Sequence, residues 1–476
     1  MRRSQPGFLL CLAAIGCAGR SPSPQTPSPT SATDAAESMA PPPFVPVVAE
    51  KNGALDATHP GPVRAKVRKS IFDAAWTAVR DKDFDRKLGG LDWNAEREKY
   101  EPLALAAPDE PTFYRLLNQM MAGLGQSHLE VHGPGESREA ILDESRGKPA
   151  KTEVVEIGMG MGDPGITVRS IEDKPTITRV RPQSSGEMAG LRPGYLVTHI
   201  GGHALDLPLA KDRALRPVEQ KFRLRRLATE RLSGPVGTGV TVRYLDGKNL
   251  AHETLLTRDP PKRAAVQALL MPPLVPEVHT ANAGTVGIIA FNFFLLDPIL
   301  GEVQRAIDSF RQSGAKAIIL DLRGNPGGFG GMAIPIAAKF LAKSTSLGAI
   351  KFRDFSNNLQ VVPPLGSKPF EGKLVILIDE GSASTSEILA AGLQEAKRAI
   401  VVGGTSVGAA LGSTIEELPS GALIQIPVAG FVTPKGISVE GRGVQPDRWV
   451  VETRVALLAG EDQVLEAAVE IAQGKK

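Results

Sequence analysis

The sequence predicts an α/β protein whose layered core is preceded by a helical region and a β-rich segment. Beyond residue 261, buried strand patterns such as Val286–Phe291 and Leu374–Asp379 alternate with helical patterns, an order typical of layered α/β domains. Between residues 63 and 125 the apolar residues recur at helical spacing. Between residues 151 and 259, short β-branched runs are separated by turns. With 476 residues, two or three cores are expected.

The first 17 residues have the pattern of a secretory signal. Arg2 and Arg3 precede an apolar run over Phe8–Ile15, which is too short to span a bilayer. Small residues then lead to Cys17, and this stretch resembles the lipobox of bacterial lipoproteins, which implies a lipid on Cys17. The alternative is an ordinary signal peptide in which Cys17 is incidental. The Pro/Ser/Thr-rich stretch Ser21–Pro46 lacks the apolar content to fold and is expected to be a tether.

Composition excludes several classes of function. The formal net charge is +3 and no basic stripe carries interleaved aromatic residues, so nucleic-acid binding is not expected. Cys11 and Cys17 are the only cysteines, which leaves the rest of the chain without a disulfide or a thiolate metal site. No group of residues has metal-ligand spacing, and neither a metal nor another cofactor is expected.

Two strand–turn–helix units in the second half carry the candidate chemistry. The unit Ala317–Phe340, with a helix expected over Met332–Ala342, and the unit Leu374–Ala396 each place a Gly- or Ser-rich turn at the carboxyl end of a strand. A serine in the second turn would lie at a helix N-terminus, where backbone N–H groups favour a developing oxyanion. The alternative is an N-cap serine with Glu387 completing a capping box.

This half contains four ordered motifs, Asp321–Gly328, Gly381–Ile388, Ala396–Gly403 and Gly441–Asp447. Together they resemble the motifs of the S41 serine peptidases, the C-terminal-processing and tricorn-core type. The resemblance implies a crotonase/ClpP-like catalytic core in which Ser384 is the nucleophile and Ser382 and Ser386 are structural. It also implies an oxyanion hole formed by the backbone N–H groups of Thr385 and Gly327.

The base of this chain departs from the processing branch. That branch has a lysine where this sequence has Ala409, which cannot take a proton, and a serine hydroxyl needs a base to become a good nucleophile. The tricorn branch uses a Ser-His pair and a late glutamate, and this sequence matches both. The resemblance therefore implies His128 as general base, with Glu440 acting on it through Ser127. His132 and Lys435 remain alternative bases.

The β-rich segment resembles a PDZ domain. Its carboxylate-binding loop would be Ile157, Gly158, Met159, Gly160 and Met161, followed by Met188–Gly194 in a helix and turn. Backbone N–H groups in such a loop capture a chain terminus while the peptide adds as a strand. Tyr195 departs from the acidic residue usual there, and the alternative is a packing module that binds nothing.

Together these observations predict an exported serine endopeptidase of the bacterial cell envelope, in the periplasm or on the outer membrane, that cleaves polypeptides with accessible C-termini. The alternative is a catalytically inactive peptide- or ligand-binding protein on the same fold, because retinoid-binding relatives show that such a core can serve binding. The predicted division is a signal peptide over residues 1–17, a tether over 18–60, a helical region over 61–150, a PDZ domain over 151–260 and the peptidase core over 261–476.

Overall fold

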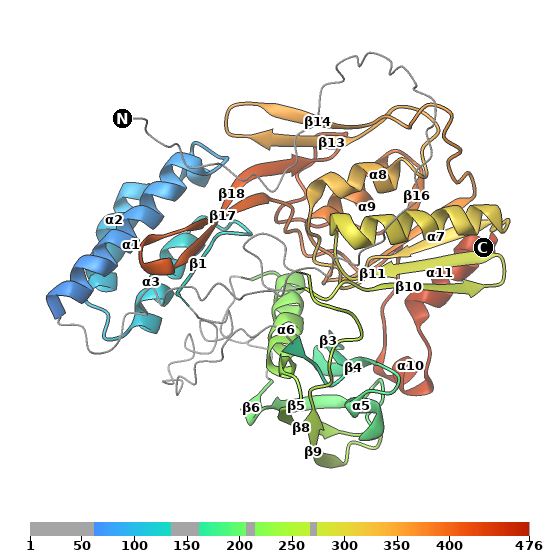
Figure 1. Cartoon of the computed structure of the whole chain (residues 1–476), viewed down its shortest axis with the longest axis horizontal. Coiled ribbons are helices and arrows are strands. Elements are labelled where there is room, and N and C mark those ends of the chain that lie inside the picture. The colour runs from blue at the N-terminus through green and yellow to red at the C-terminus, as the bar shows by residue number, and fades with distance from the viewer. Residues whose placement is uncertain (1–60, 135–160, 206–214, 267–273, 476) are drawn as a thin grey trace, which may run out of the picture.

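The computed structural model describes residues 61–134, 161–205, 215–266 and 274–475. Figure 1 shows three groups of elements: helices near the N-terminus, a β-rich unit in the middle of the sequence, and a larger α/β unit. Cys17 and the loop residues 157–160 lie outside the described residues.

The N-terminal group consists of three helices, α1 (Gly61–Lys82), α2 (Trp93–Leu105) and α3 (Glu110–Ala122), with the short turn η1 (Leu88–Gly90) between the first two. The side chains of Asp92 and Asp109 accept backbone N–H groups at the starts of α2 and α3, as N-cap residues do. The helices bury one apolar cluster that includes Phe72, Phe113 and Leu117. The helical spacing read from the sequence thus corresponds to real helices.

The α/β unit is built on a six-stranded sheet in the order β10-β11-β12-β15-β16-β19. Only β10 runs antiparallel to its neighbour. Apolar side chains are buried on both faces, which explains the uninterrupted apolar runs of β12 and β15. The strands are β10 (Val278–Ala283), β11 (Val286–Phe291), β12 (Ala317–Asp321), β15 (Lys373–Ile378), β16 (Ala399–Gly403) and β19 (Arg448–Trp449).

Helices cover both faces of this sheet. One face packs against α7 (Gly301–Gln312), α8 (Ala333–Ala337) and α9 (Thr385–Glu395), and the other against α11 (Gln463–Gln473). The chain also forms η3 (Leu296–Leu300), η4 (Gly330–Met332), η5 (Pro419–Gly421) and α10 (Arg454–Ala459).

The helix expected over Met332–Ala342 is shorter in the structure. After Ala337 the N–H groups of Lys339 and Phe340 bond to carbonyls three residues earlier, in the tighter 3₁₀ manner, and the α-helical ladder stops. Phe340 is thereby turned into the core, where it is 2% exposed.

A second, antiparallel sheet was not predicted. It joins β1 (Glu130–His132), β13 (Thr345–Phe352), β14 (Ser356–Val361), β17 (Gly412–Glu417) and β18 (Leu423–Val432). The first half of β18 packs into the helical cluster through Ile424 and Ile426, and its second half packs into the α/β core through Ala429 and Phe431. β18 therefore fastens the N-terminal helices to the α/β unit.

The β-rich unit is a sheet in the order β3-β4-β5-β8-β9, with β6 beside β5. Helix α6 (Pro217–Leu232) packs across β3 with Leu224, Leu227 and Leu232. The remaining elements are β2 (Met161–Gly162), β3 (Ile166–Ile171), β4 (Lys174–Val180), α5 (Ser185–Met188), β5 (Leu196–Ile200), β6 (His203–Ala204), β7 (Gly234–Pro235), β8 (Gly239–Leu245) and β9 (Ala251–Thr257).

Candidate active site

Ser384 lies in a sharp turn between β15 and α9. Its backbone has φ 52° and ψ −116°, and the helix begins at the next residue, Thr385. A non-glycine residue with positive φ is uncommon, and residues held in sparsely populated φ/ψ regions cost on the order of 1–3 kcal/mol and cluster at active sites. The residues before Ser384 in this turn are buried, whereas Ser384 itself is partly exposed. The fold thus strains this serine and leaves it accessible.

The two neighbouring serines have structural partners. The hydroxyl of Ser382 donates to the Leu322 carbonyl at 2.8 Å and accepts the Asp379 N–H at 3.0 Å. The hydroxyl of Ser386 donates to the Asn325 carbonyl at 2.8 Å. Both side chains are fully buried. Of the three serines in the turn, Ser384 is therefore the one placed to react.

The glycine motif packs directly against the nucleophile turn. β12 and β15 are adjacent and parallel, so the turns at their carboxyl ends meet, and Ala383 N donates to the Asn325 carbonyl at 3.1 Å. A Cβ added to Gly327 would lie 2.7 Å from Ser384 Cβ and 2.8 Å from Thr385 N. Only glycine fits at this approach, and its φ of 95° is also one that other residues rarely adopt.

The two N–H groups predicted to form the oxyanion hole have different surroundings. Thr385 is the first residue of α9, so its N–H has no partner within the helix and lies at the positive end of the helix dipole. Gly327 is predicted to supply the second donor. In this structure its N–H donates to Asn325 Oδ1 at 2.9 Å.

Ser127, His128 and Glu440 form one hydrogen-bonded group. Ser127 Oγ lies 2.8 Å from His128 Nδ1 and donates to Glu440 Oε2 at 3.0 Å. The backbone N–H of Ser127 donates to Glu440 Oε1 at 2.9 Å. Burial raises the pKa of Glu440, while the hydrogen bonds from Ser127 and Ala410 act in the opposite direction. An imidazole oriented through a hydroxyl by a carboxylate is suited to act as a general base.

Two hydrogen bonds connect this group to the nucleophile turn. Ser384 N donates to the carbonyl of Ala409 at 3.0 Å, and the N–H of the following residue, Ala410, donates to Glu440 Oε2 at 2.8 Å. Ala409 stands where the processing branch has its lysine. Its side chain cannot take a proton, but its backbone holds Ser384 next to the residue that anchors Glu440.

The two alternative bases have other surroundings. His132 Nε2 lies 3.5 Å from Glu130 Oε2 on strand β1, away from Ser127. Lys435 is exposed, and its backbone N–H donates to Glu395 at the last turn of α9. Because α9 has 11 residues and begins beside Ser384, that end lies about 15 Å from the nucleophile.

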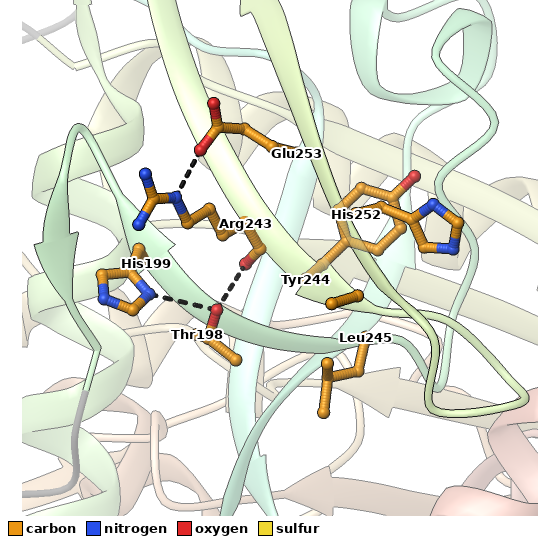
Figure 2. A pocket seen from close by; sticks show the side chains of 8 residues that line it. Thr198, His199, Arg243, Tyr244, Leu245, His252 and Glu253 are labelled. Atoms are coloured by element: carbon orange, nitrogen blue, oxygen red, sulfur yellow. Dashed lines mark hydrogen bonds and ion pairs between the residues drawn. The ribbon is translucent and has the colours of Figure 1, made fainter.

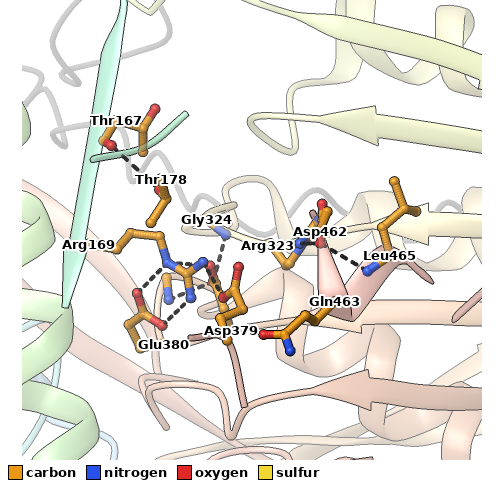
Figure 3. Close-up of polar contacts among 12 residues, drawn as sticks. Thr167, Arg169, Thr178, Arg323, Gly324, Asp379, Glu380, Asp462, Gln463 and Leu465 are labelled. Atoms are coloured by element: carbon orange, nitrogen blue, oxygen red, sulfur yellow. Dashed lines mark hydrogen bonds and ion pairs between the residues drawn. The ribbon is translucent and has the colours of Figure 1, made fainter. Parts of the chain in front are cut away.

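A buried arginine, Arg169, ties the β-rich unit to the nucleophile turn (Figure 3), a contact that was not predicted from the sequence. Arg169 on β3 donates to both carboxylate oxygens of Glu380 at 2.8 Å and to Glu452 at 2.6 Å. Removing one partner of a buried ion pair destabilises the folded protein strongly, by about 3–5 kcal/mol. The β-rich unit is therefore firmly fixed to the segment that precedes Ser384.

The same charge network reaches the glycine motif through Asp379. Its Oδ1 accepts the Gly324 N–H at 2.7 Å, and its Oδ2 accepts a hydrogen bond from Arg225 on α6 at 3.1 Å. Burial acts to raise the pKa of Asp379, but Arg169 and Arg225 outweigh burial and hold that pKa below its ordinary value. Asp379 thus stays ionised and joins the two turns.

Parts of the chain match known protein families. Residues 284–450 match the model of peptidase family S41, and residues 64–122 match the tricorn protease C1 domain. A carboxyl-terminal-processing protease of Synechocystis sp. is 27% identical over 406 residues, which cover 84% of this chain and 86% of that protein. The chain is therefore similar in sequence to a carboxyl-terminal-processing protease over most of its length. These matches support serine-type peptidase activity.

Other homologues match a smaller part. The protein of Staphylococcus haemolyticus named probable CtpA-like serine protease is 26% identical over 283 residues, covering 60% of this chain and 51% of that protein. The chain therefore spans about half the length of this relative.

Solved structures of peptidases share the fold. The photosystem II D1 C-terminal processing protease aligns with a TM-score of 0.53 and 22% identity, over 85% of this chain and 97% of that one. Mature CPAF aligns with a TM-score of 0.58 and 13% identity, over 86% of this chain and 97% of that one. The likeness confirms the predicted α/β class with a helical N-terminal region.

A separate cavity of about 310 Å³ lies on the β-rich unit, between β5, β8 and β9 (Figure 2). Its polar side chains are paired locally: Arg243 with Glu253, and His199 with Thr198. No serine lies among its lining residues, so it offers no nucleophile of the kind at Ser384. It is lined by Thr198, His199, Arg243, Tyr244, Leu245, Ala251, His252 and Glu253.

Within residues 61–134, 161–205, 215–266 and 274–475, no group of three or more His, Cys, Asp or Glu side chains could hold a metal ion. Over the same residues, no helix combines the length and apolarity needed to cross a membrane.

Proposed function

We propose that the chain is an exported serine endopeptidase with a Ser384–His128–Ser127–Glu440 tetrad. The observation that carries the proposal is that the hydroxyl of Ser127 bridges His128 and Glu440, while Ala409 and Ala410 connect Glu440 to the backbone of Ser384. In this assignment the chain needs no lysine at position 409. It resembles the processing proteases in fold and motifs and the tricorn type in its base.

Each residue of the tetrad then has a defined part in the reaction. His128 accepts the proton of the Ser384 hydroxyl as Oγ attacks the scissile carbonyl, and returns it to the leaving amine. Glu440 acts through Ser127 to orient the imidazole and to stabilise its protonated form. The N–H of Thr385 donates to the developing oxyanion, supported by the α9 dipole. Water, activated by His128, then hydrolyses the acyl-enzyme.

The β-rich unit would bind the C-terminal end of the substrate as a PDZ domain does. β3 lies at the edge of its sheet, and α6 packs beside it, which is the arrangement in which a peptide adds as an extra strand. The capture of the terminal carboxylate would fall to residues 157–160, outside the described residues, and to Met161. The division into a signal peptide, tether, helical region, PDZ domain and peptidase core, with bounds as predicted above, forms part of this proposal.

The test of the function uses one unstructured polypeptide with a free or an amidated C-terminus. The wild-type chain should cleave both forms, with a KM about tenfold lower for the free acid, because only the free carboxylate can accept charge-assisted hydrogen bonds from the loop. Turnover is measured with the Ser384→Ala variant as the inactive control. Binding of the polypeptide with no cleavage by the wild type would establish the rival binding protein, and equal KM values would remove the case for carboxylate capture.

Export with a lipid anchor on Cys17 is tested separately. Cys17→Ser should release the protein from the membrane fraction and abolish labelling by a radioactive fatty acid, because the thiol that carries the lipid is gone. Cys11→Ser makes the same substitution six residues earlier and should leave both unchanged. Persistence of fatty-acid labelling in Cys17→Ser would contradict the anchor.

A further inference from the structure

Glu387 is a fully buried carboxylate that the proposed mechanism does not use. It lies in the first turn of α9, three residues after Ser384, and its exposed fraction is 0%. Its Oε1 accepts the Ser406 hydroxyl at 2.5 Å and the Gly408 N–H at 2.7 Å. Its Oε2 accepts the N–H groups of Ser384 at 2.9 Å and Ala409 at 3.0 Å. Both oxygens are thus occupied by two donors each.

These four hydrogen bonds reach well beyond a helix cap. One comes from the nucleophile itself, and the other three come from the segment 406–409, which lies about 20 residues later in the sequence. The residue that follows this segment, Ala410, donates its N–H to Glu440. Glu387 therefore connects the backbone of the nucleophile to the segment that anchors the carboxylate of the proposed tetrad.

We propose that Glu387 is a positioning residue of the peptidase reaction, which holds Ser384 and the segment 406–409 in register so that the group at Glu440 keeps its place relative to the nucleophile. The inference rests on the proposed function, because it assigns Glu387 a part in the same site. Glu387 touches neither substrate nor the reacting atoms and acts through the backbone amides that it binds. Errors of about 1 Å in such placement cost on the order of a hundredfold in rate.

The chemistry of the site requires a carboxylate. The partners of Oε2 are both backbone N–H groups, and those of Oε1 are a hydroxyl and a third N–H. A glutamine would turn its NH₂ group toward at least one N–H donor, whichever way the amide is placed. The Ser406 hydroxyl also accepts the Val444 N–H at 2.7 Å, which leaves it little freedom to reverse its role.

The electrostatics of Glu387 favour a role in positioning over a role in stabilising the fold. Burial raises the pKa of Glu387 to about 7, against the opposing effect of its hydrogen bonds, led by that of Ser406. A carboxyl group whose pKa is raised in the folded state contributes stability at low pH that is lost as the pH rises through about 7. Two charged groups lie beside the segment 406–409. Arg216 donates to the Val407 carbonyl, and Glu440 accepts the N–H of the next residue, Ala410. Above pH 7 the ionised Glu387 is thus a cost to folding.

The test compares Glu387→Gln with Glu395→Gln, the same substitution on the same helix, where the carboxylate accepts the exposed Lys435 N–H. At pH 8, Glu387→Gln should lower kcat roughly tenfold to a hundredfold and leave KM within about threefold, because the substrate-binding surface is unchanged. Its Tm should not fall by more than a few degrees, because the variant also removes the buried charge. Hydrogen exchange at Gly408 and Ala409 should accelerate, whereas Glu395→Gln should match the wild type throughout.

Each outcome decides the inference. Wild-type kcat and wild-type exchange in a folded Glu387→Gln variant would overturn it, and so would a fall in kcat matched by an equal rise in KM. If Glu387→Gln does not fold, Ser406→Ala, which removes one of the four donors, decides instead: a lower kcat at constant KM supports the positioning role, and an unchanged kcat overturns it. If the wild type itself shows no turnover, the proposed function fails and the inference fails with it, which is a different result from an active Glu387→Gln variant.

Discussion

Replacing His128 with alanine is expected to lower kcat by at least about a thousandfold, because the Ser384 hydroxyl then has no base to take its proton. The remaining rate comes from substrate binding and from the Thr385 N–H, neither of which the substitution touches. The measurement is kcat on an unstructured polypeptide at pH 8, with KM determined separately. In the wild type, kcat should rise with pH through roughly 6–7, where a histidine ordinarily loses its proton.

The matched control for this variant is Lys435→Ala. Lys435 is exposed at the far end of α9 and is joined there to Glu395, so its loss should leave kcat within about twofold of the wild type. A nearly active His128→Ala variant beside an inactive Lys435→Ala variant would overturn the tetrad and restore a displaced Ser-Lys pair. An acid limb of the pH profile near 9 rather than 7 would point the same way.

Much of the α/β unit around Ser384 could be predicted, because the sequence patterns that indicate it are local. β12 and β15 appear in the sequence as uninterrupted apolar runs, each followed by a turn rich in small residues. Since neighbouring parallel strands end at the same edge of a sheet, their turns had to meet, and Ser384 does lie against Gly327. The direction of the Gly327 N–H could not be predicted, because it depends on the side chain of Asn325.

The antiparallel sheet could not be assembled from the sequence. Two of its pairings, β13 with β14 and β17 with β18, are hairpins of consecutive strands, but the pairings that join them to each other and to β1 are long-range. Strand β1 pairs with β18 in a register that sets Glu130 opposite Gln425. Nothing near either strand in the sequence indicates the other, yet this pairing brings the Ser127–His128 turn to the α/β unit. The alternating burial of Ile424 and Ile426 in β18 was a usable sign of a strand.

The interface between the β-rich unit and the core was missed for a related reason. Helix α6 has a helical signal, since Leu224, Leu227, Ala228 and Leu232 recur at the spacing of one helix face. The charged residues between them look like a solvated surface in the sequence. Arg225 is instead directed at Asp379, and such an ion pair across about 150 residues leaves no local pattern. Glu387 likewise matched a capping box, and only the fold shows its partners in the segment 406–409.

The substitution Glu440→Gln is expected to lower kcat by about a hundredfold, less than the loss of His128, because the imidazole remains. A glutamine oxygen in the Oε2 position can still accept from Ser127 Oγ and Ala410 N, but its NH₂ group then faces the Ser127 N–H. Ser127 is held less firmly, and the negative charge that stabilises a protonated imidazole is lost. The measurement is the pH profile of kcat for the variant and the wild type.

The acid limb is the part of the pH profile in which kcat rises with pH. Its position distinguishes an effect of the charge of Glu440 from an effect of the packing of its side chain. Without a nearby negative charge the protonated imidazole is less stable, so the limb should move to lower pH in Glu440→Gln. Burial raises the pKa of Glu440, so the stability that it contributes at low pH is lost as the pH rises through that pKa, and its ionised form costs folding free energy at pH 8. The variant should therefore lose activity at pH 8 with little loss of Tm. A large fall in Tm together with an unmoved acid limb would make Glu440 a structural residue and leave His128 without its proposed partner.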